Sequence, residues 1–201
     1  VLVDGVHFSD RTTSAYAVGW RSAAANLSDL AAMGANPVGI TIGLSLPGEV
    51  PVAWVEELYR GLQDCLTKYS TTIVGGDICR SPVISIAITA FGQVLPERVI
   101  RRDRASVGDA IVVTGIHGAS RAGLELLLNP ELGKNLTVSE REELISAHQR
   151  PQPRLDVLKY LPEIEVAGMD SSDGLADAIV QICRCSGVGA HIKPSSIPLL
   201  P

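Results

Sequence analysis

The stretch SAYAVGWRSAAANLSDLAAMGANPVGITIGLSL, residues 14–46, joins an alanine-rich segment to a run of apolar residues. Its first part, residues 14–37, predicts a long helix, because alanine favours helices and because Gly34 and Pro37 are the residue types that end them. Residues 38–46 return to the pattern of a strand. Helix and strand in close succession indicate a protein of the α/β class.

The same mixture continues on both sides of this stretch. Residues 1–8 alternate loosely like a strand, and Pro51 begins a helix that we expect to run to about Tyr69. Two further strands are predicted at residues 71–76 and 83–95. The first hundred residues therefore contain enough regular elements for one α/β unit.

The basic, irregular segment 97–109 is the best candidate for a domain junction. We place one domain at residues 1–103 and another at 104–201, the latter starting with a strand–helix unit at 110–128. A capping box formed by Thr137 and Glu140 predicts a further helix. An apolar run at 164–167, a turn and a second apolar run predict a final strand–turn–helix unit.

Composition narrows the function classes. The chain has 201 residues, 46% of them hydrophobic and 19% charged, which is typical of a globular protein. Its net charge of −5 argues against a nucleic-acid partner, and no apolar stretch approaches the length of a membrane span. We therefore expect a cytoplasmic protein with four reduced cysteines. Both ends of the sequence give the impression of a piece of a longer protein.

Three short motifs carry the candidate chemistry. In NLSDLAAMGA, Asn26 and Asp29 share one helix face among small and apolar residues, so Asp29 either faces solvent or binds a ligand. In IVGGDICRS, Gly76 and Asp77 follow an apolar strand, where a tight turn and a ligand site are both open interpretations.

The third motif, MDSSDGLAD at residues 169–177, places acidic side chains at a turn before a helix, with Ser172 positioned to cap that helix. Asp170 and Asp173 lie three residues apart there, and a turn without any ligand remains the alternative. Helix N-termini attract phosphate, which carboxylates alone would repel. Several carboxylates together suit Mg²⁺, which prefers oxygen ligands and itself binds phosphate oxygens.

Other polar residues give weaker indications. The arginines of segment 97–104 form either a solvated linker or a phosphate clamp. His7 is a candidate for a base, a phosphate donor or a structural histidine. His117, His148 and His191 fall in loop-like surroundings and form no constellation with serine or cysteine. The sequence contains neither a nucleophile elbow nor a Walker P-loop.

Seven segments taken in order resemble the thiamine-monophosphate kinases over almost the whole chain: DGVHF, NLSDLAAMGANP, VGGD, RRDRASVGD, VTGIHGASRAGLELL, RPQPRL and DSSDGLAD. The VGGD and VTG segments also fit the wider superfamily of aminoimidazole-ribonucleotide and selenophosphate synthetases. The resemblance implies the two-domain α/β (α+β) fold of that superfamily, with a first domain whose mixed sheet pairs in a dimer barrel and a second domain that is only partly contained here.

The resemblance also implies an activity: ATP- and Mg²⁺-dependent phosphorylation of thiamine monophosphate to thiamine diphosphate, in a homodimer. By the family's pattern, several Mg²⁺ ions would be held by Asp29, Asp77, Asp170 and Asp173. ATP would contact Gly76, Asp77, Arg102 and Ser172, and His7 would lie at the thiamine monophosphate. No residue beyond these metal and nucleotide ligands is expected to be catalytic, because phosphoryl transfer depends on positioning and charge neutralisation.

Two other functions remain open. The first is another ATP-using synthetase of the same superfamily, which would phosphorylate an amide or acyl oxygen. The second is a nucleotide-binding dimerisation module without turnover, although four carboxylates without a metal would be a liability for such a module.

Overall fold

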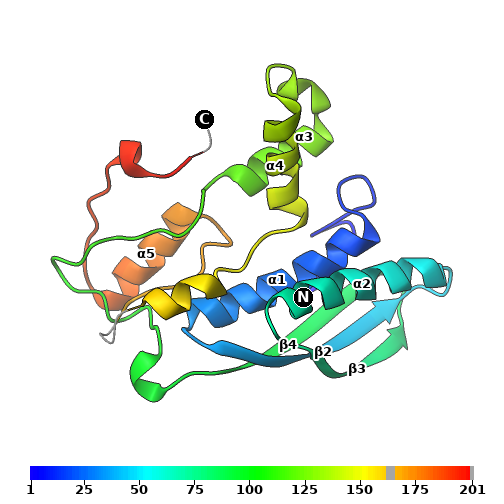
Figure 1. The fold of residues 1–201 in the computed structure, drawn as a ribbon, viewed down its shortest axis with the longest axis horizontal. Helices are drawn as coiled ribbons and strands as arrows, with labels where there is room; N and C mark the ends of the chain where they lie inside the picture. The colour runs from blue at the N-terminus through cyan, green and yellow to red at the C-terminus, as the bar shows by residue number, and fades with distance from the viewer. Residues whose placement is uncertain (162–165, 200–201) are drawn as a thin grey trace.

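The computed structural model describes residues 1–161 and 166–199, and the N-terminal half forms a four-stranded sheet with two helices on one face (Figure 1). The strands follow the spatial order β1-β4-β2-β3; β2 and β3 are parallel, while β4 is antiparallel to both β1 and β2. The mixed sheet is thus confirmed. The elements of this half are β1 (Leu2–Val3), α1 (Ala15–Ala32), β2 (Asn36–Leu46), α2 (Val52–Lys68), β3 (Ile73–Arg80) and β4 (Ser85–Gln93).

The core lies between the sheet and the two helices. Alternate residues of β2, such as Ile40, Ile42 and Leu44, are at most 1% exposed and belong to one apolar cluster with Leu58 and Leu62 of α2. Alternation arises because successive strand side chains point to opposite faces of the sheet. The strand pattern of the sequence therefore determines which face the helices cover.

Glycines allow α1 and α2 to pack backbone against backbone. A methyl group placed on Gly19 would lie 1.9 Å from the carbonyl oxygen of Leu58, and one on Gly61 would lie 1.9 Å from that of Tyr16. No side chain fits at such distances, so both positions require glycine. This close contact fixes the position of α1, whose C-terminal turn carries Asp29.

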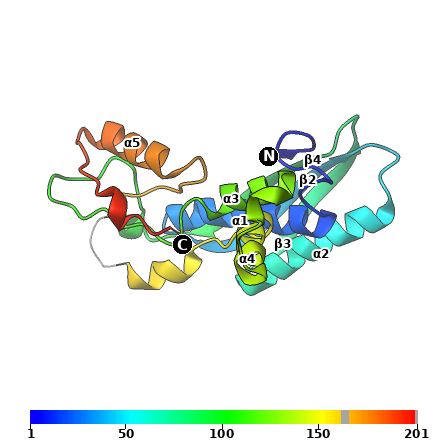
Figure 2. The same cartoon turned by 90° about the horizontal axis from the view of Figure 1, so that it is seen from above.

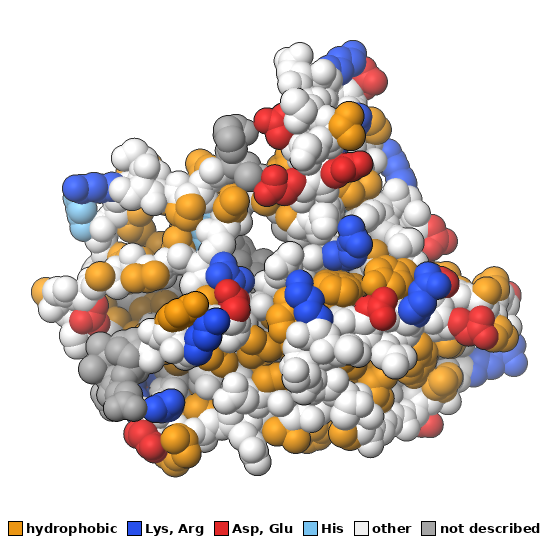
Figure 3. Space-filling view, in the orientation of Figure 1, with side chains coloured by type: hydrophobic (Ala, Val, Ile, Leu, Met, Phe, Trp, Pro, Cys, Tyr) orange, Lys and Arg blue, Asp and Glu red, His pale blue; other side chains and the backbone are white. Residues whose placement is uncertain are grey.

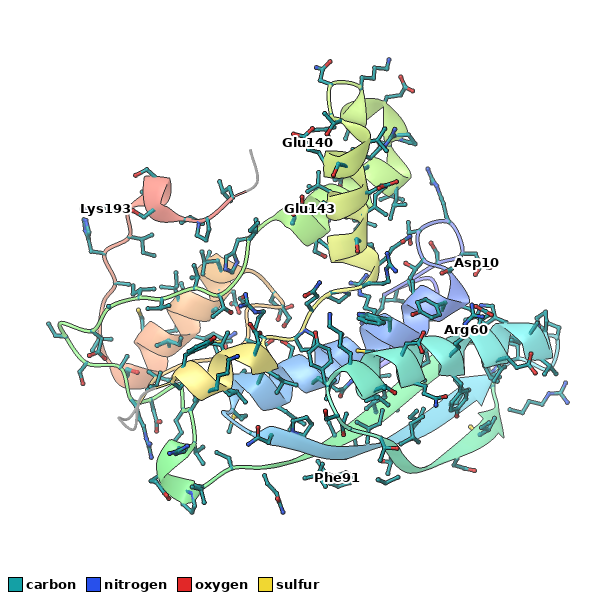
Figure 4. The ribbon with its side chains drawn as sticks, in the orientation of Figure 1. Asp10, Arg60, Phe91, Glu140, Glu143 and Lys193 are labelled. Carbon is teal, nitrogen blue, oxygen red and sulfur yellow. The ribbon has the colours of Figure 1, made fainter. Side chains whose placement is uncertain are left out.

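No helix of the described residues covers the opposite face of the sheet. Phe91 pairs with Gly39 in the antiparallel register, points away from the helices and is 47% exposed (Figure 4). Figure 3 shows hydrophobic side chains at the surface along this side of the sheet. Asp77 pairs with Gly43 and shares this open face.

The other described residues form helices and loops that pack around the two ends of α1. Helices α3 (Ala119–Leu128) and α4 (Val138–Gln149) make a hairpin, and α5 (Leu175–Ser186) lies at the other end of the molecule from α2 (Figure 2). Short 3₁₀ turns complete the chain: η1 (Pro96–Arg98), η2 (Pro130–Gly133), η3 (Leu155–Tyr160) and η4 (Pro194–Ser196). Among the described helices, none is both long and apolar enough to cross a membrane.

Side-chain hydrogen bonds attach the α3–α4 hairpin to the start of α1. The indole nitrogen of Trp20 donates to the carbonyl oxygen of Pro151 at 2.9 Å, and the Gln149 amide donates to the carbonyl oxygen of Thr12 at 2.7 Å. His148 is 5% exposed, with its Nε2 3.0 Å from Arg21 Nη1. The interpretation of His148 as a loop residue is therefore wrong, because it lies buried in α4.

Several local expectations are corrected by the structure. Residues 110–114 form no strand, since no neighbouring strand supplies hydrogen bonds to them, and only residues 2–3 of segment 1–8 are in the sheet. The helix predicted at 14–37 ends at Ala32, and Pro37 already belongs to β2. Of the strand expected at 164–167, residues 164 and 165 lie outside the described residues, and Ala167 forms only an isolated bridge. The capping box of Thr137 and Glu140 is confirmed.

Candidate functional site

A pocket of about 560 Å³ lies where the C-terminal end of α1 meets two loops. The C-terminal part of α1 contributes Asp29, the first loop contributes Arg101 and Arg102, and the second loop contributes Asp170. The rest of its lining is Ala32, Met33, Val99, Ile100, Asp103, Gly168, Met169 and Cys185. Three of the predicted site residues, Asp29, Arg102 and Asp170, thus line one pocket although they are far apart in the sequence.

Backbone hydrogen bonds hold these three segments together. The amide of Ile100 donates to the carbonyl oxygen of Met33 at 3.1 Å, and the amide of Gly168 donates to that of Arg101 at 3.1 Å. Arg101 and Ala167 also form an isolated parallel bridge. Ile100 directly precedes Arg101, and Gly168 lies two residues before Asp170. These backbone bonds therefore hold the arginine loop against both α1 and the loop that carries Asp170.

Two of the three aspartates that line the pocket, Asp29 and Asp170, influence each other electrostatically. Asp29 is exposed, but partial desolvation of its carboxyl by the surrounding segments, and secondly repulsion from the Asp170 carboxylate, raise its pKa above the ordinary value. The positive charge of the amino terminus offsets this repulsion only in part. A cation bound between the two carboxylates would remove it, which is the arrangement expected of a metal site.

The two arginines of the pocket differ in their partners. Arg101 donates through Nε and Nη2 to both carboxylate oxygens of Asp103, at 2.9 and 2.6 Å. Arg102 donates through Nη1 to Oε1 of Gln181 in α5 at 2.9 Å. Arg101 is therefore engaged by a neighbouring anion, whereas Arg102 contacts a neutral amide and keeps its positive charge uncompensated by an ion pair within the described part of the chain.

Ser172 does not cap α5, so that expectation was wrong. Its hydroxyl donates to Oδ2 of Asp170, and the N-cap position of α5 is Gly174, which makes no side-chain cap. Asp173 is exposed on the same turn. The one residue of α5 in the pocket lining, Cys185, belongs to its last turn. The first turn of α5 does not line this pocket, so a phosphate bound at the N-terminus of that helix would lie outside the pocket lining.

The remaining predicted residues lie on the sheet and its N-terminal loop. Gly76 and Asp77 are inside β3, an edge strand, where both are exposed. His7 is exposed in the loop after β1, and its Nδ1 accepts a hydrogen bond from the amide of Val3 at 3.1 Å. Because Nδ1 accepts, the neutral ring carries its hydrogen on Nε2, which is left to donate to a ligand.

The carboxylates fit magnesium only in part. Among residues 1–161 and 166–199, no group of three or more His, Cys, Asp or Glu side chains is close enough to hold a metal ion. The pair Asp29 and Asp170 does fit, because Mg²⁺ binds through one or two carboxylates and completes its shell with water and phosphate oxygens. Asp77 and Asp173 are placed elsewhere and do not line this pocket.

A wider pocket of about 890 Å³ lies between the end of β4 and η3, lined by residues such as Leu95, Leu155 and Lys159. Of the described residues around it, none is a predicted site residue. Its size alone gives no reason to prefer it as the site of chemistry.

Sequence reasoning missed three residues around Arg102. Gln181 bonds its guanidinium, and the hydroxyl of Ser186 donates to its carbonyl oxygen at 2.8 Å and accepts from the amide of Ala105 at 3.0 Å. Cys185 lines the pocket. The one available signal was the spacing of Asp177 and Gln181, four residues apart on one helix face.

Known proteins resemble both the sequence and the fold. Residues 1–94 match the family described as AIR synthase related protein, N-terminal domain. A thiamine-monophosphate kinase of Synechococcus elongatus is 53% identical over 207 residues, covering 98% of this chain and 62% of the relative. The chain therefore spans about three fifths of the length of that relative.

Solved structures give the same result. The crystal structure of thiamine-monophosphate kinase from Stenotrophomonas maltophilia K279a superposes with a TM-score of 0.90 at 37% identity, covering 99% of this chain and 63% of that one. A structure of AaThiL complexed with AMPPCP and TMP has a TM-score of 0.83 at 40% identity, covering 92% of this chain and 58% of that one. The chain belongs to the thiamine-monophosphate kinase family, within the AIR-synthase-related proteins.

Proposed function

We propose that the protein transfers the γ-phosphoryl group of ATP to thiamine monophosphate, forming thiamine diphosphate in a Mg²⁺-dependent reaction. The observation that carries this proposal is the pocket at the end of α1, where the carboxylates of Asp29 and Asp170 lie together with two guanidinium groups. A phosphoryl-transfer site needs metal ligands and phosphate donors together, and this pocket offers both. Family membership supplies the substrate class.

The pocket residues suit this reaction in distinct ways. Asp29 and Asp170 would hold Mg²⁺, which when bound neutralises phosphate charge and orients the oxygens for in-line transfer. Arg102 would donate to a nucleotide phosphate, because its charge faces the pocket without a carboxylate partner. The acceptor is itself an anionic phosphate, so the chain needs no strong general base.

The other expected ligands extend this proposal to the open face of the sheet. Asp77 lies on that face, His7 on the loop after β1, and Asp173 and Ser172 on the turn before α5. We include further Mg²⁺ ions at Asp77 and Asp173, ATP at Gly76, Asp77 and Ser172, and thiamine monophosphate at His7.

A homodimer is part of the proposal. The open face exposes Phe91 (47%), and β3 forms an edge of the sheet; an apolar sheet face next to an edge strand is a favourable surface for pairing. A second copy of the sheet would cover both and complete a barrel. The proposal also divides the chain into two domains, residues 1–103 and 104–201. It places the protein in the cytoplasm.

The test is formation of thiamine diphosphate from thiamine monophosphate, ATP and Mg²⁺ by the whole protein, with EDTA as the control. Asp29→Asn should reduce turnover by at least a hundredfold, since one metal ligand is lost. Glu143→Gln on the exposed side of α4 (Figure 4) makes the same chemical change away from the pocket and should leave turnover intact. Turnover of Asp29→Asn within a few-fold of the wild type would refute the metal assignment.

Two outcomes would favour the alternatives. Binding of ATP without any thiamine diphosphate formation would favour a sister synthetase with another acceptor. Binding without hydrolysis or transfer to any acceptor would favour the dimerisation module.

A further inference from the structure

Helix α5 contacts the loop that carries Arg102 at two points. At the first, Nη1 of Arg102 donates to Oε1 of Gln181, and Nε2 of Gln181 donates to Oδ2 of Asp177. Gln181 therefore uses its carbonyl oxygen for the arginine and its amide nitrogen for the aspartate. The aspartate can only accept when ionised, so it fixes which end of the Gln181 amide faces Arg102.

At the second point, Ser186 binds the loop backbone. Its hydroxyl donates to the carbonyl oxygen of Arg102 and accepts from the amide of Ala105. The side chain of Arg102 and its own backbone are thus held by two residues of one helix. Arg101 lacks this arrangement in the described contacts and is instead paired with Asp103.

Holding an exposed arginine in place has a functional consequence. A free arginine loses much rotamer freedom when it binds a phosphate, and binding is stronger when that loss has already occurred on folding. Gln181 occupies Nη1 only, so in the described structure Nε and Nη2 of Arg102 remain for a ligand. These two atoms can present the fork that binds two phosphate oxygens.

We propose that Gln181, oriented by Asp177, and Ser186 are positioning residues that hold Arg102 ready for a nucleotide phosphate at the pocket. This proposal rests on the proposed function in taking the ligand to be the nucleotide. In this proposal α5 contributes to nucleotide affinity through the side chains of Gln181 and Ser186 and not through the amides of its first turn, which do not line the pocket. It also explains why the DSSDGLAD motif includes a third acidic residue, Asp177, that faces Gln181 rather than the pocket.

The first experiment measures nucleotide binding by calorimetry and steady-state kinetics in the whole protein. Gln181→Met keeps the length of the side chain and removes both hydrogen bonds. We expect about tenfold weaker nucleotide binding and a matching rise in KM for ATP, with kcat and the KM for thiamine monophosphate nearly unchanged. Gln63→Met, an exposed glutamine on α2, is the matched control and should change nothing.

A double-mutant cycle separates positioning from a general structural effect. In an Arg102→Gln background, Gln181→Met should cause no further loss of nucleotide affinity, because there is no guanidinium left to position. Ser186→Ala should weaken binding, and Ser186→Thr, which keeps the hydroxyl, should restore most of it. Additive losses in the cycle, or unchanged affinity in Gln181→Met, would overturn the proposal.

The two proposals fail in different ways. If the wild type makes no thiamine diphosphate, the kinase assignment fails, while the binding cycle still tests the role of Gln181. If Arg102→Gln binds nucleotide as tightly as the wild type, the positioning role is overturned and the kinase assignment stands on product formation.

Discussion

Protonation of His148 should destabilise the fold. The ring is buried between α1, α3 and α4, where Arg21 Nη1 lies 3.0 Å from Nε2 and Ser120 Oγ lies 3.5 Å from Nδ1. The guanidinium can only donate, so Nε2 must accept and the ring is neutral. A protonated ring would place two cations side by side. Burial, followed by the charge of Arg21, lowers the pKa of His148 from 6.5 to about 4.

The sign and size of the effect follow from this pKa. In the unfolded chain His148 takes up a proton near pH 6.5, whereas in the fold it does so only near pH 4, so the unfolded state binds more protons between these values. The stabilising contribution is complete above pH 6.5 and is lost as the pH falls towards 4. The loss is about 2 to 3 kcal/mol by pH 4.5.

Urea unfolding at pH 7.0 and 4.5 measures this loss. Trp20 fluorescence is a suitable signal, because its indole donates to Pro151 at the same junction. The control is His148→Gln, which still offers Arg21 an oxygen acceptor but does not titrate. The wild type should lose about 2 to 3 kcal/mol more than this variant between the two pH values. Parallel pH profiles of the two proteins would show that the neutral, buried state of His148 is wrongly assigned.

Three further results are expected. Gly19→Ala should lower the free energy of unfolding by about 3 kcal/mol, because the added methyl group would collide with the Leu58 carbonyl oxygen. Thermal melts measure this loss, and an unchanged melting temperature would contradict the close contact between α1 and α2. Thr137→Ala should cost about 1 kcal/mol through loss of the capping box, whereas Thr137→Ser should cost little. Asp29→Asn should leave unchanged or raise the melting temperature of the metal-free protein, because the raised pKa of Asp29 shows that its negative charge is unfavourable in the fold. The same substitution should weaken Mg²⁺-dependent nucleotide binding. A lower melting temperature would show that the charge is not unfavourable there.

Features with a local cause could be predicted from the sequence. Helix α2 was expected from Pro51 to Tyr69 and runs from Val52 to Lys68, because one apolar stripe and a proline at its start determine it. The capping box was predictable for the same reason, since both of its residues lie within one turn. Such features need no knowledge of the rest of the chain.

Features that depend on distant partners could not be predicted in this way. Val112 is 80% exposed in a run that has the composition of a strand, but a strand exists only where another strand accepts its hydrogen bonds. Ser172 has the residue type of a helix cap, yet α5 begins at Leu175 with Gly174 at its N-cap position, and the Ser172 hydroxyl donates to the Asp170 carboxylate instead of lying at the cap. In both cases the local preference was present, and the arrangement of the surrounding chain decided the outcome.

The pocket combines both kinds of information. Asp29 was recognised as a candidate because a carboxylate among alanines is costly without a ligand. Its neighbourhood with Asp170 depends instead on two backbone bonds, Ile100 to Met33 and Gly168 to Arg101, between segments far apart in the chain. The pocket charges lie on an exposed helix face and on loops, outside the apolar layer between α1, α2 and the sheet. The fold therefore tolerates them without burying a charge in its core. Substitutions of the pocket charges should therefore affect ligand binding far more than folding, whereas substitutions such as Gly19→Ala should do the reverse.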